Sequence, residues 1–300
     1  MKSEIIVNQT AGGGKPKQIM PQIISYFNQR EFQFHISYTS ANKGATLLAR
    51  KAANQGVDLV VSVGGDGTIN EIVNGLLTAK HQPILGIIPA GWANDFIKSI
   101  PIPNQVESAC EIIGRGKTMP IDVGLINNSI YFVNVFGIGL DAEIAKRANQ
   151  MKSDHPKWKT LSAYVYVFAA LQKLLQSLPC YKTKMTIDQT KVNENLLILA
   201  IANGKIEGGK FNIAPEAKIN DGLLDICLIK KLSKWRCLKF LPKAMNGTHK
   251  KVPEVCFYHG RQITIEIDRP VSAQVAGEII PAQKIYQIKL LPHQLNIIVP

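Results

Sequence analysis

The chain has 300 residues, 46% of them hydrophobic, and a formal net charge of +13 from 35 Lys and Arg against 22 Asp and Glu. This length favours two domains, and the hydrophobic content is sufficient for two cores, which excludes a largely disordered chain. The positive charge suits an anionic partner, such as a nucleotide, a nucleic acid or an anionic lipid surface.

Neither the cysteines nor the apolar segments indicate export or a membrane span. The five cysteines are scattered without a CxxC pair and are expected to be reduced thiols. Residues 1–10 lack the long apolar segment of a signal peptide. The longest apolar segment, 163–171, is shorter than the roughly 18 residues that span a bilayer. We therefore expect a cytoplasmic protein whose membrane contact is peripheral.

Strands and helices alternate in the first 120 residues, which predicts an α/β domain with a parallel sheet. The loop NQTAGGGK at 8–15 is either a second anion-binding turn or a flexible connection. The predicted strands are 4–8, 32–39, 57–63 and 83–89, and the predicted helices include 17–28, 43–55 and one that begins at Thr68.

The segment 57–76, VDLVVSVGGDGTINEIVNGL, carries the strongest chemical signal. A buried strand ends at glycines that suggest a turn with positive φ, and Thr68 then begins a helix in a capping box with Glu71. The N–H groups of such a turn, together with the helix N-terminus, bind phosphate. Asp66 would repel the phosphate without a cation or an acceptor hydroxyl, so it favours phosphoryl transfer. A purely geometric role for the turn is the alternative.

A second strand end is expected beside the first. The strand 83–89 ends in AGWANDF, and the carboxyl ends of parallel strands share one edge of a sheet. Asp66 and Asp95 are therefore expected to flank one ligand. Asn94 and Asp95 are equally suited to capping a turn. Thr39 ends its strand on the same side of the sheet.

After Pro120 short alternating strands predict a largely antiparallel sheet or sandwich. Two helices are predicted among them: 158–178, whose apolar stripe is expected to face the core, and 233–245, whose basic side chains face solvent or anionic headgroups. The turn at 220–222 needs no ligand by itself. The predicted strands are 121–125, 130–136, 182–188, 195–203, 223–230, 254–258 and 262–267, with a strand-like tail at 284–291 and 294–299.

Together these motifs resemble the diacylglycerol kinase catalytic-domain family, which includes bacterial diacylglycerol and phosphatidylglycerol kinases and the sphingosine and ceramide kinases. The resemblance covers nearly the whole chain. It implies a three-layer α/β domain with a parallel sheet (1–120), a β-sandwich-like domain (121–284) and a last segment (285–300) that returns to the first domain. The matching motifs are GGDGTINEIVNGL at 64–76, AGWANDF at 90–96, IDVG at 121–124, NVFGIGLDAEI at 134–144, GGKFNIAPEAKINDGLLDI at 208–226 and AGEII at 276–280.

The resemblance also implies an activity and a site. It implies ATP and Mg²⁺ as cofactors, and as acceptor a hydroxyl of a membrane lipid such as diacylglycerol, within phospholipid biosynthesis. Asp66 would help to hold the catalytic metal, and Glu278 would accept the proton of the lipid hydroxyl. Asp221, with the carbonyls of Lys218 and Leu223, would hold a structural Mg²⁺. The residues implied at the nucleotide are Asn8, Gly12, Thr39, Gly64, Gly65, Asp66, Gly67, Thr68, Ile69, Asn70, Glu71, Trp92, Asn94 and Asp95.

Two positions depart from the family pattern. Trp92 stands where a Thr hydroxyl would meet the nucleotide, and Ala276 stands where an Asp would accompany Glu278. A catalytically weakened or inactive nucleotide- or lipid-binding homologue is therefore a second hypothesis. An NAD kinase, which also carries GGDGT, is a third, although residues 208–225 favour the lipid-kinase branch. Nucleic-acid binding rests on charge alone and is not expected. The oligomeric state is left open, with a homodimer as one option.

Overall fold

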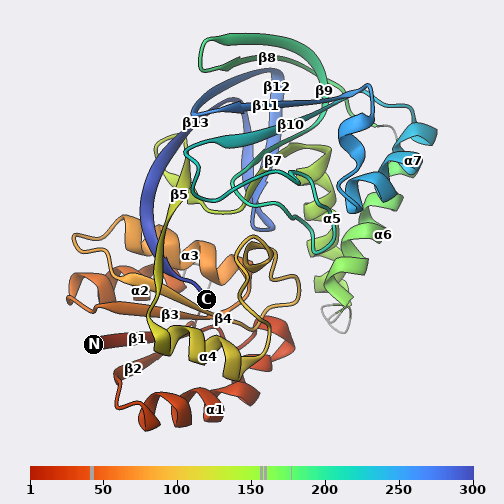
Figure 1. Ribbon diagram of the computed structural model, residues 1–300. Helices are drawn as coiled ribbons and strands as arrows, with labels where there is room; N and C mark the ends of the chain where they lie inside the picture. The colour runs from red at the N-terminus through yellow and green to blue at the C-terminus, as the bar shows by residue number, and fades with distance from the viewer. Residues whose placement is uncertain (41–43, 156–157, 159–160, 177) are drawn as a thin grey trace.

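The computed structural model describes residues 1–40, 44–155, 158, 161–176 and 178–300. The N-terminal half is an α/β unit and the C-terminal half is rich in strands, so the predicted two-part architecture is confirmed (Figure 1). Both termini of the chain lie in the N-terminal half, which is the lower part of the view.

The strands are β1 (Lys2–Val7), β2 (Gln33–Tyr38), β3 (Leu59–Gly64), β4 (Ile84–Pro89), β5 (Thr118–Ile126), β6 (Ile130–Phe132), β7 (Val135–Gly139), β8 (Tyr181–Ile187), β9 (Thr190–Ala202), β10 (Leu224–Lys230), β11 (Val255–Gly260), β12 (Gln262–Val275) and β13 (Glu278–Ile298). The helices are α1 (Lys15–Gln29), α2 (Gly44–Asn54), α3 (Asp66–Leu77), α4 (Val106–Arg115), α5 (Leu140–Asp154), α6 (Ser162–Leu175) and α7 (Lys234–Met245), with short 3₁₀ turns at Ala11–Gly13, Phe96–Lys98 and His249–Lys251.

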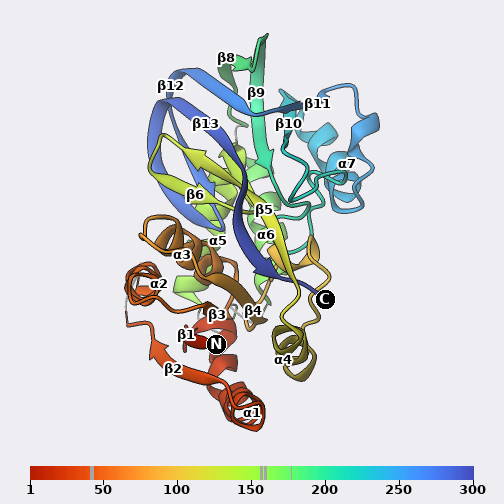
Figure 2. The same ribbon diagram turned by 60° about the vertical axis from the view of Figure 1, so that its left-hand side comes forward.

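In the N-terminal half, β4, β3, β1 and β2 pair side by side and in parallel. Helices α2 and α3 cover one face of this sheet, and α1 and α4 cover the other (Figures 1 and 2). Because both faces are covered, all six residues of β3 are buried. The loops that follow β1, β3 and β4 leave the sheet at the same edge, where the ligand site was expected.

One strand joins the two halves. Most of β13 pairs antiparallel with β12 and β5, and its end pairs in parallel with β4 through Ile297 and Leu85. The strands of the described chain therefore form one continuous 13-stranded sheet. The strands predicted at 284–291 and 294–299 are parts of β13. The pairing register shifts between Leu291 and Leu295, where His293 has a φ of 51°.

The antiparallel strands of the C-terminal half are present, with three corrections. The predicted strand 130–136 is two strands, β6 and β7, and β12 continues from residue 267 to Val275. Helix α5 was not predicted. Its buried side includes Leu140, Ile144, Ala148 and Met151, which recur at helical spacing, so the sequence did carry a signal for this helix.

The predicted helix 158–178 corresponds to α6. Residues 156–157, 159–160 and 177 lie outside the described residues, as do 41–43 at the start of the predicted helix 43–55. The prediction that its large apolar stripe faces the core holds for Val165, and Leu178 is half-buried against the core, but it is wrong for the other five residues, which are exposed. The exposed residues are Leu161, Tyr164, Phe168, Leu171 and Leu175, and the buried ones are Val165, Ala169, Ala170 and Leu174. Since α6 is apolar on both sides, its periodicity could not identify the buried one.

The remaining expectations concern the thiols and the membrane. All five cysteines are unpaired in the structure, as their scattered positions predicted. Within the described ranges, no helix combines the length and apolar character needed to cross a bilayer.

Candidate active site

A cleft of about 390 Å³ lies between the two halves of the molecule, in the usual size range for a small-molecule site. The loops after β1, β3 and β4 contribute one wall. The loop after β9 and the β12–β13 hairpin contribute the other. The predicted site residues that line this cleft are Asn8, Gly12, Gly65, Asp66, Gly67, Thr68, Glu71, Trp92, Asp95 and Glu278.

The glycine turn after β3 differs from the predicted geometry. Helix α3 begins at Asp66, and Gly65 is its N-cap in an extended conformation with a φ of −106°. The prediction of positive φ in this turn is therefore wrong. Close packing requires the glycines instead: a Cβ atom on Gly64 would lie 2.5 Å from Thr68 Oγ1, and one on Gly65 would lie 3.0 Å from the Cα of Gly91. The turn thereby allows the loops after β3 and β4 to touch.

Thr68 and Glu71 do not form the predicted capping box. The Thr68 hydroxyl accepts a hydrogen bond from the side-chain amide of Asn8 at 3.0 Å. The Glu71 carboxylate accepts one at 3.0 Å from the backbone N–H of Ala45, in the first turn of α2. Thr68 and Glu71 therefore attach the loop after β1 and helix α2 to α3, while both also line the cleft.

Several residues assigned to the nucleotide are absent from the described lining of the cleft, namely Thr39, Gly64, Ile69, Asn70 and Asn94. The assignment of Ile69 is wrong, because its side chain is buried in the core and its N–H donates to the carbonyl of Gly65. Asn94 also has a different role, since its Oδ1 accepts from the Gly91 N–H at 3.0 Å and its amide donates to Asn104 at 3.2 Å. Asn94 therefore stabilises the turn after β4. This turn-capping role was the alternative that the sequence left open.

Trp92 lies on the cleft without filling it. Its side chain is 41% exposed, and the ring packs so closely on Gly13 that a Cβ atom there would lie 2.8 Å from Trp92 Cζ2. The indole therefore covers part of the loop after β1. The cleft of about 390 Å³ persists beside it, so Trp92 does not occlude the site.

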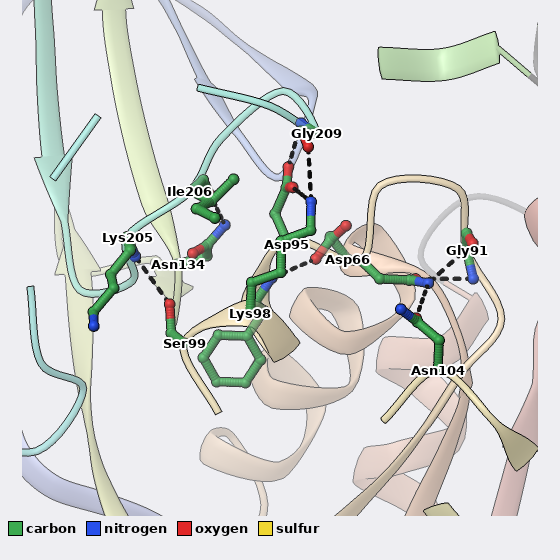
Figure 3. Close-up of polar contacts among 12 residues, drawn as sticks. Asp66, Gly91, Asp95, Lys98, Ser99, Asn104, Asn134, Lys205, Ile206 and Gly209 are labelled. Carbon is green, nitrogen blue, oxygen red and sulfur yellow. Dashed lines mark hydrogen bonds and ion pairs between the residues drawn. The ribbon is translucent and has the colours of Figure 1, made fainter. Parts of the chain in front are cut away.

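Asp66 and Asp95 come together at the edge of the sheet, as the strand order predicted (Figure 3). Asp66 accepts a hydrogen bond from the N–H of Phe96 at 2.9 Å. Asp95 accepts one from Lys98 and one from the N–H of Gly209, both at 2.8 Å. Burial, followed by the charge of Asp66, raises the pKa of Asp95 to about 6, against the opposing effect of Lys98. Asp95 thus links the N-terminal half to the loop after β9 while it faces a second carboxylate.

These two carboxylates fit a magnesium ion. No group of three or more His, Cys, Asp or Glu side chains suitable for a metal occurs in the described part of the chain. Mg²⁺ at a phosphoryl-transfer site, however, uses one or two carboxylates and completes its shell with phosphate and water oxygens. Lys98 pairs with Asp95 at 2.8 Å and offsets part of the repulsion between Asp66 and Asp95, and a bound cation would offset it further.

A buried polar cluster at the far end of the cleft was not predicted from the sequence. Asp141 accepts hydrogen bonds from the Tyr166 hydroxyl at 2.5 Å and from the Gln274 amide at 2.8 Å. The same amide contacts Glu207. Burial, followed by the charge of Asp141, raises the pKa of Glu207 well above its ordinary value. Asp141 lies in the motif 134–144, whereas the other three come from segments without a motif, so only the fold could reveal them.

The polar cluster separates the cleft from an apolar cavity. This cavity, of about 60 Å³, lies between the sheet and helices α5, α6 and α7. Tyr166 and Glu207 line both the cavity and the cleft. The cavity therefore adjoins the cleft, although its volume is well below the roughly 300–1,000 Å³ of a usual ligand pocket.

At the predicted structural Mg²⁺ site, Asp221 is exposed and its carboxylate accepts a hydrogen bond from the N–H of Leu223 at 3.1 Å. A different carboxylate holds this loop. Asp122 is fully buried and accepts from the N–H groups of Gly222 at 2.7 Å and His293 at 2.8 Å. Asp122 thereby connects β5, the loop before β10 and the bend in β13.

Asp122→Ala is expected to lower the free energy of unfolding by about 3 kcal/mol, because the buried N–H of Gly222 and the part-buried N–H of His293 lose their acceptor. The melting temperature should fall by roughly 10 °C, measured by circular dichroism. Asp221→Ala is the matched control and should change stability by no more than about 0.5 kcal/mol in the absence of Mg²⁺. Added Mg²⁺ should stabilise the unmodified protein more than Asp221→Ala, which retains Asp66 and Asp95. Equal losses in the two variants would contradict this assignment of roles.

The chain is similar to known proteins over almost its whole length. Residues 2–126 match the family model described as diacylglycerol kinase catalytic domain, and residues 134–299 match the YegS C-terminal NAD kinase beta sandwich-like domain. The diacylglycerol kinase of Bacillus subtilis (strain 168) is 28% identical over 279 residues, which cover 92% of this chain and 89% of that protein. The diacylglycerol kinase of Staphylococcus aureus (strain MRSA252) is 28% identical over 280 residues, or 92% of this chain and 86% of that protein.

A solved structure agrees with these similarities in sequence. The crystal structure of a diacylglycerol kinase from Bacillus anthracis str. Sterne superposes with a TM-score of 0.81 at 26% identity and covers 100% of this chain and 97% of that one. On the family model, the relatives and the shared fold, the chain belongs to the diacylglycerol kinase catalytic-domain family, a family of lipid kinases.

Proposed function

We propose that this chain transfers the γ-phosphate of ATP to a hydroxyl of a membrane lipid, with diacylglycerol, for which its relatives are named, as the first acceptor to test. The observation that carries the proposal is the position of the cleft. Backbone loops and Asp66 line its N-terminal side, Glu278 lines the opposite side, and an apolar cavity adjoins its end. This arrangement suits a polar phosphate donor and a lipid acceptor that meet in one site.

Each part of the cleft has a chemical role in this proposal. The N–H groups at the start of α3 and in the loop after β1 bind the phosphates. Asp66, with Asp95 beside it, holds Mg²⁺, which neutralises phosphate charge when bound. Glu278 accepts the proton of the lipid hydroxyl as the oxygen attacks. The acceptor is taken up at the membrane surface, in peripheral contact, with residues 1–120 as the nucleotide domain and 121–284 as the lipid domain.

The direct test is an acceptor panel with purified protein, Mg²⁺ and ATP labelled on its γ-phosphate. Diacylglycerol, monoacylglycerol, phosphatidylglycerol, a sphingoid base and NAD are offered separately. Labelled lipid phosphate supports the proposal. Label in NAD alone would favour the NAD kinase hypothesis. This hypothesis is tested because the family model that matches the C-terminal half is described as an NAD kinase beta sandwich-like domain. Failure of every acceptor, with retained ATP binding, would favour a binding protein.

The hairpin beside Glu278 offers a sharper test of activity. Ala276 and Gly277 connect β12 to β13, with φ values of 50° and 82°. A two-residue hairpin with both φ values positive favours Asn or Asp followed by Gly, whereas alanine is strained there. An Asp at position 276 would therefore relieve backbone strain in addition to supplying a carboxylate.

Ala276→Asp is expected to raise kcat by about tenfold or more if the site is a weakened kinase, because a second carboxylate joins Glu278. Ala276→Asn is the matched control: it relieves the same strain without a charge. Both should raise the melting temperature slightly, and only Ala276→Asp should raise kcat. An equal rise in kcat for both variants would show that the hairpin conformation, and not the added carboxylate, causes the effect. No rise in either would contradict the prediction.

A further inference from the structure

Glu278, the proposed proton acceptor, comes directly after the hairpin that joins β12 to β13. The two loop residues of this hairpin are Ala276 and Gly277, with φ values of 50° and 82°. Alanine is strained at such a φ, and a strained residue persists only where surrounding contacts fix it. The contacts that hold the peptide groups before Glu278 therefore decide where its carboxylate lies.

One of these contacts comes from Gln274, a side chain of β12 that is only 2% exposed. Its Oε1 accepts a hydrogen bond from the N–H of Gly277 at 2.9 Å, which holds the peptide group between Ala276 and Gly277. Its Nε2 donates to Asp141 at 2.8 Å and also contacts Glu207. The carbonyl and the two N–H groups of this amide each face a partner, and this fixes the orientation of the amide.

Asp141 is itself held in place. Its carboxylate accepts a hydrogen bond from the Tyr166 hydroxyl at 2.5 Å. Gly137 of β7, which pairs with Gln274, leaves room for this arrangement, because a Cβ atom there would collide with the Asp141 carboxylate. A glycine inside a strand weakens it and commonly marks such a close approach. Asp141 and Glu207, which the proposed chemistry does not use, thus orient the amide that holds the hairpin.

The next peptide group is held from helix α5. The side-chain amide of Asn149 donates a hydrogen bond to the carbonyl of Gly277 at 2.7 Å, and this carbonyl belongs to the peptide bond with Glu278. Helix α5 also supplies Asp141, about two turns earlier, and packs against both β12 and β13. Two consecutive peptide groups before Glu278 are therefore bound by side chains from outside the hairpin loop.

We propose that Gln274 and Asn149 are positioning residues, which hold the hairpin so that the Glu278 carboxylate meets the acceptor hydroxyl in the cleft. Gln274 also lines the cleft, but its amide is fully engaged within the protein. The inference rests on the proposed function in one respect, namely that Glu278 accepts the proton of that hydroxyl. A misplacement of about 1 Å can lower a rate by about 10²-fold, so a loosened hairpin should lower kcat.

Asn149→Ala is expected to lower kcat by about tenfold and Gln274→Met by up to about 10²-fold, with ATP affinity unchanged in calorimetry. Asn149 is exposed within α5 and alanine favours helices, so the melting temperature of Asn149→Ala should match the unmodified chain. Gln274→Met leaves buried carboxyl groups without a donor, so its rate is measured well below its own melting temperature. Gln150→Ala, at an exposed neighbouring position outside the described lining of the cleft, is the matched control and should keep the unmodified kcat.

A double-mutant cycle separates positioning from general damage. If Asn149 and Gln274 act through Glu278, neither substitution should lower kcat further in the Glu278→Gln background. The same fold-loss in both backgrounds would overturn the proposal. So would an unchanged kcat for Asn149→Ala and Gln274→Met while Glu278→Gln is nearly inactive. Full activity of Glu278→Gln would instead contradict the role of Glu278 in the proposed function.

The hairpin can also be followed without catalysis. The backbone order parameter of Glu278 from ¹⁵N relaxation should be about 0.85 in the unmodified chain and in Gln150→Ala, and below about 0.6 in Asn149→Ala and Gln274→Met. The N–H of Gly277 should exchange with solvent about tenfold faster in Gln274→Met. Unchanged order in both variants would overturn the proposal whatever the rates. Lost order in both, in a chain that phosphorylates no acceptor, would support the positioning roles and contradict the proposed function alone.

Discussion

Asp66→Asn is expected to lower kcat by about 10³-fold while the protein remains folded. The asparagine Oδ1 can still accept the N–H of Phe96, so the turn between the loops after β3 and β4 keeps its hydrogen bond. The substitution removes the negative charge that would hold Mg²⁺ at the phosphates. The Mg²⁺ concentration for half-maximal rate should rise as well. Initial rates at varied Mg²⁺ and saturating ATP measure both effects.

Asp154→Asn is the matched control for Asp66→Asn. Asp154 ends α5 and is exposed, outside the described lining of the cleft, so its substitution should leave kcat and the Mg²⁺ dependence unchanged. If Asp66→Asn kept more than half of the activity at every Mg²⁺ concentration, its metal-holding role would be refuted. If both variants lost activity alike, the cause would be a general loss of charge.

Glu278→Gln is expected to lower kcat by about 10²- to 10⁴-fold, because the lipid hydroxyl loses its proton acceptor. The affinity for ATP should be unchanged, since Glu278 is on the C-terminal wall and the phosphate-binding loops are on the N-terminal wall. Rates with the best acceptor of the panel and ATP binding by calorimetry measure the two quantities separately.

Glu266→Gln provides the control for Glu278→Gln on the preceding strand. Glu266 is an exposed carboxylate of β12 outside the lining of the cleft, and kcat should not respond to its substitution. Weakened ATP binding by Glu278→Gln with unchanged kcat would show that Glu278 acts on the nucleotide and would refute its role as proton acceptor.

Helices α3 and α6 show which structural features could be predicted from the sequence and which could not. The turn after β3 could be predicted from neighbouring residues alone. A buried strand, small residues and the start of a helix predict a βα turn beneath a ligand, independent of the rest of the fold. Even here the detail was wrong: Gly64 packs closely against Thr68 in the next helix turn, and Gly65 packs against Gly91 in the loop after β4. For α6 the pattern predicted the helix and not its buried side, since the side is chosen by the neighbours.

The sequence by itself determined the alternation of elements, the GGDG turn and the meeting of Asp66 with Asp95, because strand polarity alone brings parallel strand ends to one edge. Only the tertiary structure decided which carboxylates are buried and what they contact. Asp122 and Asp141 lie in recognised motifs and Glu207 lies in none, but no local pattern indicates the contacts of any of them, since their partners lie in distant segments. It also decided that the large apolar residues of α6 face outward. Burial and long-range contacts depend on how the whole chain packs, and no single window of sequence contains that information.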